Sequence, residues 1–197
     1  MPLGSEKPLL SFDLDGVLAA PPLGRNFTIQ RRPDLLPHAL ATRTAPEPDP
    51  RPSLHDRLLI QTYFRIRYQG REPMPGAQAA VVAAATRYRV IVLTARNWRG
   101  RKATEAWLRR HGILEHVERV VLNNTALVSA RFKERVAQQL GVARHVEDDA
   151  ATAALVARAG VEVDLIDWPG NRGLVFPERV TRCADLAALT RSLTDDC

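Results

Sequence analysis

The carboxylates of Asp13 and Asp15 are the first side chains in the chain whose type and spacing could do chemistry. They follow an apolar run at residues 9–12 and precede Gly16. Alternate side chains of an extended segment point to the same side, so both carboxylates are expected to reach one pocket. Two acids this close repel each other unless a cation neutralises one or a proton sits on the other. The pair therefore predicts either a metal site or an acid/base dyad.

A second group of polar residues follows the apolar run at residues 90–93. Thr94, Ala95 and Arg96 come next, ahead of a predicted helix. A hydroxyl, free backbone amides and a helix N-terminus together suit the binding of a phosphate. Thr94 could also be a simple helix cap, and Arg96 could be a solvated surface residue instead of a bidentate phosphate ligand.

A lysine and three consecutive acids complete the candidates. Lys133 lies near the start of a predicted helix with Arg131 beside it, and on local sequence alone it is expected to be exposed. Glu147, Asp148 and Asp149 follow a short predicted strand and precede an alanine-rich helix. The helix dipole favours acids in the first turn, so one or two of them could be structural. Three at the end of a strand are hard to explain by capping alone.

Strands and helices are expected to alternate strictly after residue 76. The expected strands are 89–93, 119–122, 145–147 and 161–166, and the expected helices are 77–88, 101–110, 130–140, 150–159 and 184–193. This alternation predicts a Rossmann-like α/β fold, in which helices cover both faces of a parallel sheet. Ligands of such sheets bind at the carboxyl ends of the strands, and functional residues are expected just after the strands.

Residues 19–74 interrupt this alternation. Four alternating prolines at residues 46–52 predict an extended loop, and the apolar spacing of residues 56–69 predicts one amphipathic helix. Residues 25–71 hold nine arginines against four acids, which accounts for most of the net charge of +6. An excess of this kind favours an anionic partner.

In their order, the four groups of residues resemble the motifs of the haloacid dehalogenase (HAD) superfamily of phosphatases. The resemblance implies that Asp13 is the nucleophile and that Asp15 is the general acid/base. It also implies a Mg²⁺ ion held by Asp13, the backbone carbonyl of Asp15 and Asp148, with Glu147 and Asp149 as alternative further ligands. Hard oxygen ligands are those that Mg²⁺ prefers.

The same resemblance implies a division of the chain and the remaining roles in the site. Residues 1–18 and 75–197 would form the HAD-like catalytic core, and residues 19–74 a small arginine-rich cap inserted after the first strand. Thr94 and Lys133 would hold the phosphoryl oxygens, with Ala95 and Arg96 beside them and Arg131 as the competitor of Lys133.

The expected function is a Mg²⁺-dependent phosphatase that acts through an aspartyl-phosphate intermediate. A small metabolite such as a nucleoside monophosphate is favoured, because residues 163–172 and 179–180 are similar to the end of the 5'(3')-deoxyribonucleotidases. A 3'-phosphatase of DNA or RNA ends and a non-catalytic phosphate-binding module are the alternatives. Without a long apolar run, a signal-peptide pattern or a cysteine framework, a cytoplasmic protein with no membrane partner is expected. No oligomeric state is predicted.

Overall fold

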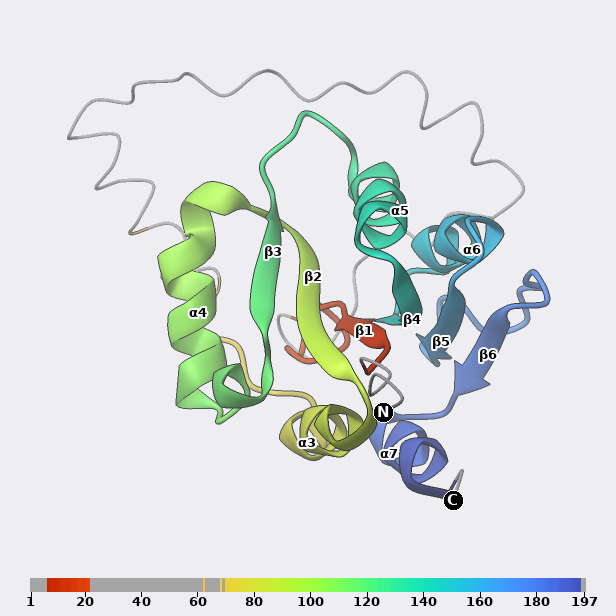
Figure 1. Ribbon diagram of the computed structural model, residues 1–197, viewed down its shortest axis with the longest axis horizontal. Helices are drawn as coiled ribbons and strands as arrows, with labels where there is room; N and C mark the ends of the chain where they lie inside the picture. Colours follow the sequence, from red (N-terminus) through yellow and green to blue (C-terminus); the bar gives the residue numbers. More distant parts are fainter. Residues whose placement is uncertain (1–6, 22–61, 63–67, 69, 196–197) are drawn as a thin grey trace, which may run out of the picture.

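One parallel sheet forms the centre of the molecule (Figure 1). The computed structural model describes residues 7–21, 62, 68 and 70–195. The strands are β1 Leu9–Phe12, β2 Arg89–Asn97, β3 Arg119–Asn123, β4 Val142–Glu147, β5 Glu162–Ile166 and β6 Val180–Cys183. They lie in the order β3-β2-β1-β4-β5-β6, and every neighbouring pair is parallel. The predicted Rossmann-like α/β class is confirmed.

Helices cover both faces of this sheet. They are α3 Ala77–Arg87, α4 Arg101–Arg110, α5 Ser129–Leu140, α6 Ala150–Arg158 and α7 Leu186–Asp195, with two short 3₁₀ turns, η4 Trp98–Gly100 and η5 Leu114–His116. Helices α5 and α6 pack on one face, and α3, α4 and α7 pack on the other (Figure 1). None of the helices in the described part of the chain is long and apolar enough to cross a bilayer.

The alternation of side chains along β1 divides the core into two layers. Leu10 and Phe12 are buried in the cluster that contains α3, α4 and α7, whereas Leu9 is buried in the cluster that contains α5. Because both faces are covered, three of the four residues of the central strand β1 are apolar. Ser11, the exception in β1, is buried on the α5 side, next to the end of the strand where Asp13 lies.

The expected end of β2 and the alternative role of Thr94 as a helix cap are both wrong. β2 does not end at residue 93 but continues to Asn97, which pairs with Asn123 of β3 after a register shift, so Thr94, Ala95 and Arg96 lie within a strand. The cap at this end is therefore Asn97, whose side chain accepts a hydrogen bond from the backbone N–H of Arg99, and not Thr94. β6 was not expected from the sequence, because Thr181 and Arg182 are exposed on an edge strand and give no apolar pattern.

The ends of the insertion meet beside the first strand. The backbone N–H of Ala20 donates to the carbonyl of Glu72 at 2.8 Å, and that of Met74 donates to the carbonyl of Leu18 at 2.8 Å. The predicted extended loop and nearly all of the predicted helix at 56–69 lie outside the described residues. The assignment of residues 19–74 to a cap accordingly stays a prediction.

Candidate active site

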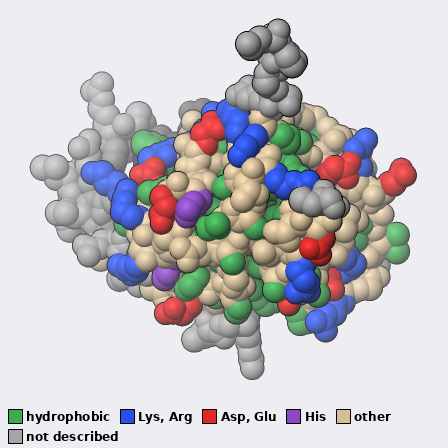
Figure 2. All heavy atoms as spheres, turned by 60° about the horizontal axis from the view of Figure 1, so that its bottom comes forward, with side chains coloured by type: hydrophobic (Ala, Val, Ile, Leu, Met, Phe, Trp, Pro, Cys, Tyr) green, Lys and Arg blue, Asp and Glu red, His purple; other side chains and the backbone are tan. Residues whose placement is uncertain are grey.

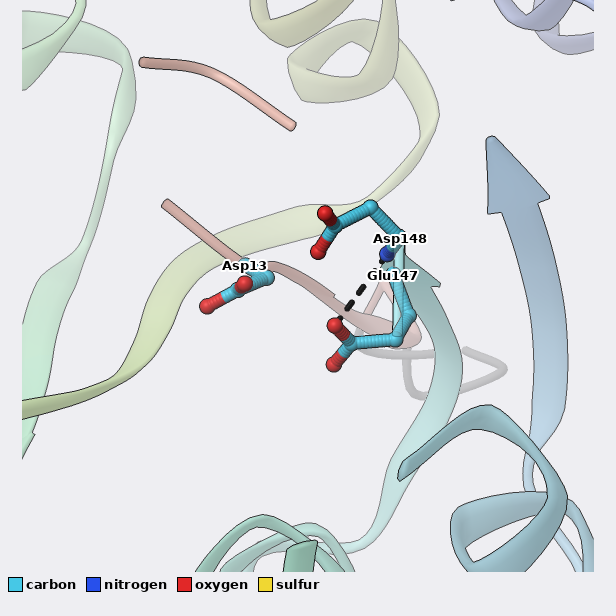
Figure 3. Close-up of side chains that lie close together, drawn as sticks. All are labelled: Asp13, Glu147 and Asp148. Carbon is cyan, nitrogen blue, oxygen red and sulfur yellow. Dashed lines mark hydrogen bonds between the residues drawn. The ribbon is translucent and has the colours of Figure 1, made fainter. Parts of the chain in front are cut away.

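Three buried carboxylates gather where β1 and β4 end. Ligand oxygens of Asp13, Glu147 and Asp148 all lie within 4.8 Å of one another, as Figure 3 shows for the three side chains. β1 and β4 are neighbours, and the backbone N–H of Asp13 donates to the carbonyl of Val146 at 2.9 Å. The sheet therefore brings together acids that lie far apart in the sequence.

Lys133 of α5 enters this cluster from the face that α5 covers. Its Nζ is 2.9 Å from Asp13 Oδ1 and 2.8 Å from Glu147 Oε2, and the side chain is only 3% exposed. Burial would lower the pKa of Lys133, but the two carboxylates outweigh it and hold the pKa well above its usual range. The expectation of an exposed lysine on local sequence is wrong. Arg131 pairs instead with Glu134 on its own helix at 2.9 Å.

Both oxygens of Glu147 accept hydrogen bonds within the protein. Oε2 accepts from Lys133 and from His145 Nε2 at 3.0 Å, and Oε1 accepts from the backbone N–H groups of Asp148 and Asp149 at 3.1 Å. Burial alone would raise the pKa of Glu147, but Lys133 and His145 hold it well below its usual range. Glu147 is therefore a fixed anion that organises its neighbours.

Burial makes the ionised forms of Asp13 and Asp148 unfavourable. Burial and the nearby Glu147 raise the pKa of Asp13 to about 7 and raise the pKa of Asp148 well above its usual range. Gly16 makes room for this arrangement, because a Cβ there would lie 2.0 Å from Asp148 Oδ2. Buried carboxylates that repel one another supply hard oxygen ligands, which fit a small divalent cation such as Mg²⁺.

Asp149 lies outside this cluster and caps α6. Its Oδ1 accepts from the backbone N–H of Thr152 at 2.8 Å and from the Thr152 hydroxyl at 2.7 Å. Such an N-terminal cap is the ordinary structural role of an aspartate. Of the three consecutive acids, the geometry thus favours Asp148 as the metal ligand, with Glu147 engaged elsewhere and Asp149 used by the helix.

The loop after β5 supports Asp148 and was not singled out from the sequence as part of the site. Asn171 is buried and donates from Nδ2 to the backbone carbonyls of Asp148, at 3.1 Å, and Ile166, at 2.9 Å. Trp168 Nε1 donates to the carbonyl of Gly16 at 3.3 Å. Only the position of Asn171 could have indicated this role, because a polar residue just after a predicted strand lies at the same edge of the sheet as the other site residues.

Asp15 is held by two arginines. Arg96 binds it with two nitrogens, Nε to Oδ2 at 2.9 Å and Nη2 to Oδ1 at 2.6 Å, and Arg71 Nη1 also contacts Oδ1. Burial would raise the pKa of Asp15, but Arg96 and then Arg71 outweigh it and lower the pKa. Arg96 is itself buried, and its guanidinium carbon is 4.0 Å from the centre of the Tyr68 ring. Arg96 is therefore not a solvated surface arginine, and its predicted contact with a phosphate stays a prediction.

Searches with the sequence match no family model and no curated protein. Solved structures do match. A haloacid dehalogenase-like family hydrolase from Xanthomonas campestris shares 14% identity over 98% of this chain and 96% of its own, with a TM-score of 0.59. CbbY from Rhodobacter sphaeroides, solved in complex with phosphate, shares 15% identity over 92% of this chain and 95% of its own, with a TM-score of 0.58. The chain therefore has a HAD-like fold.

The HAD-like fold is compatible with more than one reaction. A 2-haloacid dehalogenase from Pseudomonas syringae shares 14% identity over 97% of this chain and 100% of its own, with a TM-score of 0.52. Identities this low show the fold alone, so the reaction must be argued from the site. The similarity of residues 163–172 and 179–180 to nucleotidases stays a prediction.

Within this HAD-like fold, the residues of β2 expected to hold phosphate lie beside the carboxyl end of β1. Phe12 of β1 pairs with Val92 of β2, so Asp13 and Thr94 both lie just beyond this pair. Thr94 is buried, and its hydroxyl accepts from the backbone N–H of Arg96 at 3.3 Å, while Ala95 is partly exposed. The residues predicted for the site are thus gathered at one edge of the sheet, except that Asp149 is used as a cap.

Proposed function

We propose that the protein is a Mg²⁺-dependent phosphatase that hydrolyses a phosphate monoester through an aspartyl-phosphate intermediate. The observation that carries the proposal is the buried contact of Lys133 with Asp13, beside the second acid Asp148. A fixed cation next to a buried carboxylate favours the ionised form of that carboxylate and can neutralise the charge of an incoming phosphoryl group.

In the first step of this reaction, an oxygen of Asp13 attacks phosphorus and the bond to the leaving oxygen breaks. Asp15 gives a proton to that oxygen, so the alcohol leaves neutral. Because Arg96 and Arg71 lower the pKa of Asp15, it must first take up this proton as the bound substrate displaces part of their contact. Water then attacks the phosphorus of the acyl phosphate, Asp15 takes up a proton from the water, and phosphate and free Asp13 result. The Thr94 hydroxyl, the backbone N–H of Ala95 and Lys133 are the donors proposed for the phosphoryl oxygens.

Asp13, Asp148 and the backbone carbonyl of Asp15 are the groups proposed to hold Mg²⁺. When bound, the ion neutralises negative charge that would otherwise keep the phosphate away from Asp13. The raised pKa values of Asp13 and Asp148 support this assignment, because a divalent cation compensates the repulsion that raises them.

The presence of Asp15 favours a phosphatase over a dehalogenase, because only the phosphatase reaction needs a proton for its leaving group. Expulsion of a halide needs no proton, whereas an alkoxide leaving from phosphorus is much easier to expel with one. The bidentate contact of Arg96 orients the Asp15 carboxylate and holds it ionised, while its side chain is 35% exposed and within reach of a leaving group. The presence of a carboxyl group at this position, and not its resting protonation, supports a phosphate ester as the substrate.

A small phosphorylated metabolite such as a nucleoside monophosphate is the proposed substrate. A 3'-phosphorylated DNA or RNA end is the second candidate, which one observation favours: the indole of Trp98, next to the Arg96 end of β2, is 45% exposed and could stack on a base. A cytoplasmic location belongs to the proposal as well, supported by the composition and by the buried free thiol of Cys183.

The test is hydrolysis of p-nitrophenyl phosphate and of an alkyl phosphate, each with Mg²⁺ and with EDTA. We expect turnover only with the ion, and none above background in Asp13→Asn. Asp15→Asn should lose about 10²–10⁴-fold on the alkyl phosphate but much less on the activated phenol. Activity that persists in EDTA would refute the metal assignment, and equal losses on both substrates would refute the acid role of Asp15. No turnover of any phosphate ester would leave the non-catalytic module as the better explanation.

A further inference from the structure

His145 is a buried histidine that the chemistry proposed above does not use. It lies in β4, in register with Ser11 of β1, and is completely buried. Its Nδ1 is 2.8 Å from Ser11 Oγ and 3.2 Å from the Ser11 carbonyl oxygen, and its Nε2 is 3.0 Å from Glu147 Oε2. The ring therefore connects the middle of β1 to the carboxylate that holds Lys133.

The contact with Glu147 defines which ring nitrogen of His145 must carry a proton. An ionised carboxylate can only accept hydrogen bonds, so Nε2 must donate to Glu147. The Ser11 hydroxyl can donate to an unprotonated Nδ1, whereas the Ser11 carbonyl could only accept from a protonated one. The hydroxyl is the nearer of the two, and it can pair with Nδ1 either as a donor or as an acceptor.

His145 is one of four donors that bind the Glu147 carboxylate. The carboxylate has about four lone-pair positions, and four donors meet it: Lys133 and His145 at Oε2, and the backbone N–H groups of Asp148 and Asp149 at Oε1. Yet its oxygens lie within 4.8 Å of those of Asp13 and Asp148, close enough to share a cation with them. His145 supplies one of the contacts that turn Glu147 toward Lys133.

We propose that His145 is a positioning residue that withholds Glu147 from the metal ion. Donating from Nε2 to Glu147 and anchored at Nδ1 by Ser11, it fixes the Glu147 carboxylate on Lys133 and so restricts the protein ligands of the cation to Asp13, Asp148 and a backbone carbonyl. The inference rests on the proposed function for its metal, and it adds a determinant of which metal the site selects.

The expected effect follows from the different demands of Mg²⁺ and Ca²⁺. Mg²⁺ requires near-octahedral geometry and keeps several waters, whereas Ca²⁺ takes six to eight oxygen ligands in flexible geometry. If Glu147 is released, it becomes a third carboxylate for the cation. The site should then favour Ca²⁺ over Mg²⁺ more than it does in the native protein.

Two substitutions at residue 145 separate the hydrogen bonds of the ring. Glutamine places an amide nitrogen near the position of Nε2 and can keep the bond to Glu147. Asparagine places its amide nitrogen near the position of Nδ1 and can contact only Ser11. Asp164→Asn is the matched control, because Asp164 is also buried in the neighbouring strand β5 but pairs with Arg144, away from the cluster.

The experiment is titration calorimetry of Mg²⁺ and Ca²⁺, each alone, into the native protein and these variants. We expect His145→Asn to shift the ratio of the two affinities toward Ca²⁺ by about tenfold. His145→Gln and Asp164→Asn should keep the native ratio, even if they lower the melting temperature. An unchanged ratio in His145→Asn, or equal shifts in the asparagine and glutamine variants, would overturn the proposal.

The ¹⁵N chemical shifts of the His145 ring supply a readout that needs neither metal nor turnover. We expect Nε2 in the native protein to carry the proton that it donates to Glu147. A native Nε2 without a proton would overturn the inference. If the native protein bound Mg²⁺ but hydrolysed no phosphate ester, the proposed function would fail while both measurements still decided the role of His145. If it bound no divalent cation, this inference would fail with the metal assignment.

Discussion

The Lys133 ammonium lies between two carboxylates in the interior of the protein, 2.9 Å from Asp13 Oδ1 and 2.8 Å from Glu147 Oε2. Moving a charge of this kind out of water costs several kcal/mol, so it is stable there only with close partners. The same partners depend on Lys133, because Asp13 and Glu147 are buried beside each other. One side chain therefore supports both the packing of α5 and the ionisation of the proposed nucleophile.

Replacing Lys133 with methionine should damage stability and turnover together. The apolar side chain has a similar length but leaves two buried carboxylates without their cation, and breaking such a pair costs about 3–5 kcal/mol. Turnover of p-nitrophenyl phosphate should fall about 10²–10³-fold, the range expected for one lost charge-stabilising donor. Thermal unfolding without Mg²⁺ and initial rates with saturating Mg²⁺ would measure the two effects.

Arg131→Met is the matched control for this variant, since Arg131 pairs on the surface of the same helix with Glu134. An exposed pair of this kind is worth at most about 1 kcal/mol. If the Arg131 variant lost as much activity as the Lys133 variant, the assignment of Lys133 would be wrong and Arg131 would take its place.

Mg²⁺ affinity should rise with pH through the neutral range. Burial and the neighbouring acids raise the pKa of Asp13 to about 7, so below that pH a proton occupies the carboxylate that the ion needs. One displaced proton weakens binding by about tenfold per pH unit below the pKa. Calorimetry at about pH 6 and about pH 8 would show this difference, and proton release on binding should appear as a heat that depends on the buffer.

Asp13→Asn supplies the control for this pH dependence. It should bind Mg²⁺ more weakly at both pH values, and its affinity should change less between them. Some dependence should remain, because the pKa of Asp148 is also raised by burial and by Glu147. Equal native affinity at both pH values would contradict the assignment of Asp13 as a ligand with a raised pKa.

At the scale of elements, apolar periodicity predicted most of the fold because both faces of the sheet are covered. α4 has the predicted bounds, and α5 begins one residue before its predicted start. The periodicity could not indicate β6, which is half exposed, nor the extension of β2 through polar residues 94–97.

The sequence predicted the candidate-site residues that directly follow or lie in predicted strands, such as Asp13, Thr94 and Asp148. It did not indicate residues that only position other side chains, because their local sequence has no distinctive pattern. His145 looks like a core histidine, and Asn171 looks like a loop residue. The position of Arg96 was predicted, but its partner Asp15 depends on a contact that only the folded chain makes.

Asn171, in the loop after β5, should stabilise the position of the proposed metal ligand Asp148. Replacing Asn171 with alanine removes donors to the carbonyls of Asp148 and Ile166, and its Oδ1 also accepts from the Trp168 backbone N–H at 3.1 Å. Leaving buried polar groups unpaired costs about 1–3 kcal/mol each. We expect a lower melting temperature and weaker Mg²⁺ binding, measured by unfolding with and without the ion.

Asn124→Ala is a control for the Asn171 variant, because Asn124 is exposed in the turn after β3. It should leave both unfolding curves close to those of the native protein. If Asn171→Ala lowered the melting temperature equally with and without Mg²⁺, the loop would support the fold but not the metal position.

At the scale of the whole molecule, the charge is distributed unevenly along the chain. Residues 25–71 hold nine of the 28 Lys and Arg residues but only four of the 22 Asp and Glu residues, so the remainder of the chain is nearly balanced. Figure 2 agrees with this balance for the face that it shows, where acidic and basic side chains are interspersed. The arginines of the insertion are therefore the feature of the sequence that bears most on the size of the substrate.

The salt dependence of KM should distinguish a small substrate from a polymer. A mononucleotide has one phosphate group to bind, so KM should change little with salt, and only one or two of Arg25, Arg31, Arg32, Arg65 and Arg67 should matter. A single-stranded 3'-phosphorylated oligonucleotide would engage several phosphates, and the logarithm of its affinity would fall with the logarithm of salt by about 0.7 per phosphate neutralised. We expect the weak dependence, because the sequence of the insertion lacks an aromatic series on which consecutive bases could stack.

The measurement is KM for both substrates at low and moderate salt, in the native protein and in single arginine-to-glutamine variants. A strong preference for the oligonucleotide, with a steep slope that each variant flattens, would contradict the small-metabolite proposal and favour a phosphatase of nucleic-acid ends.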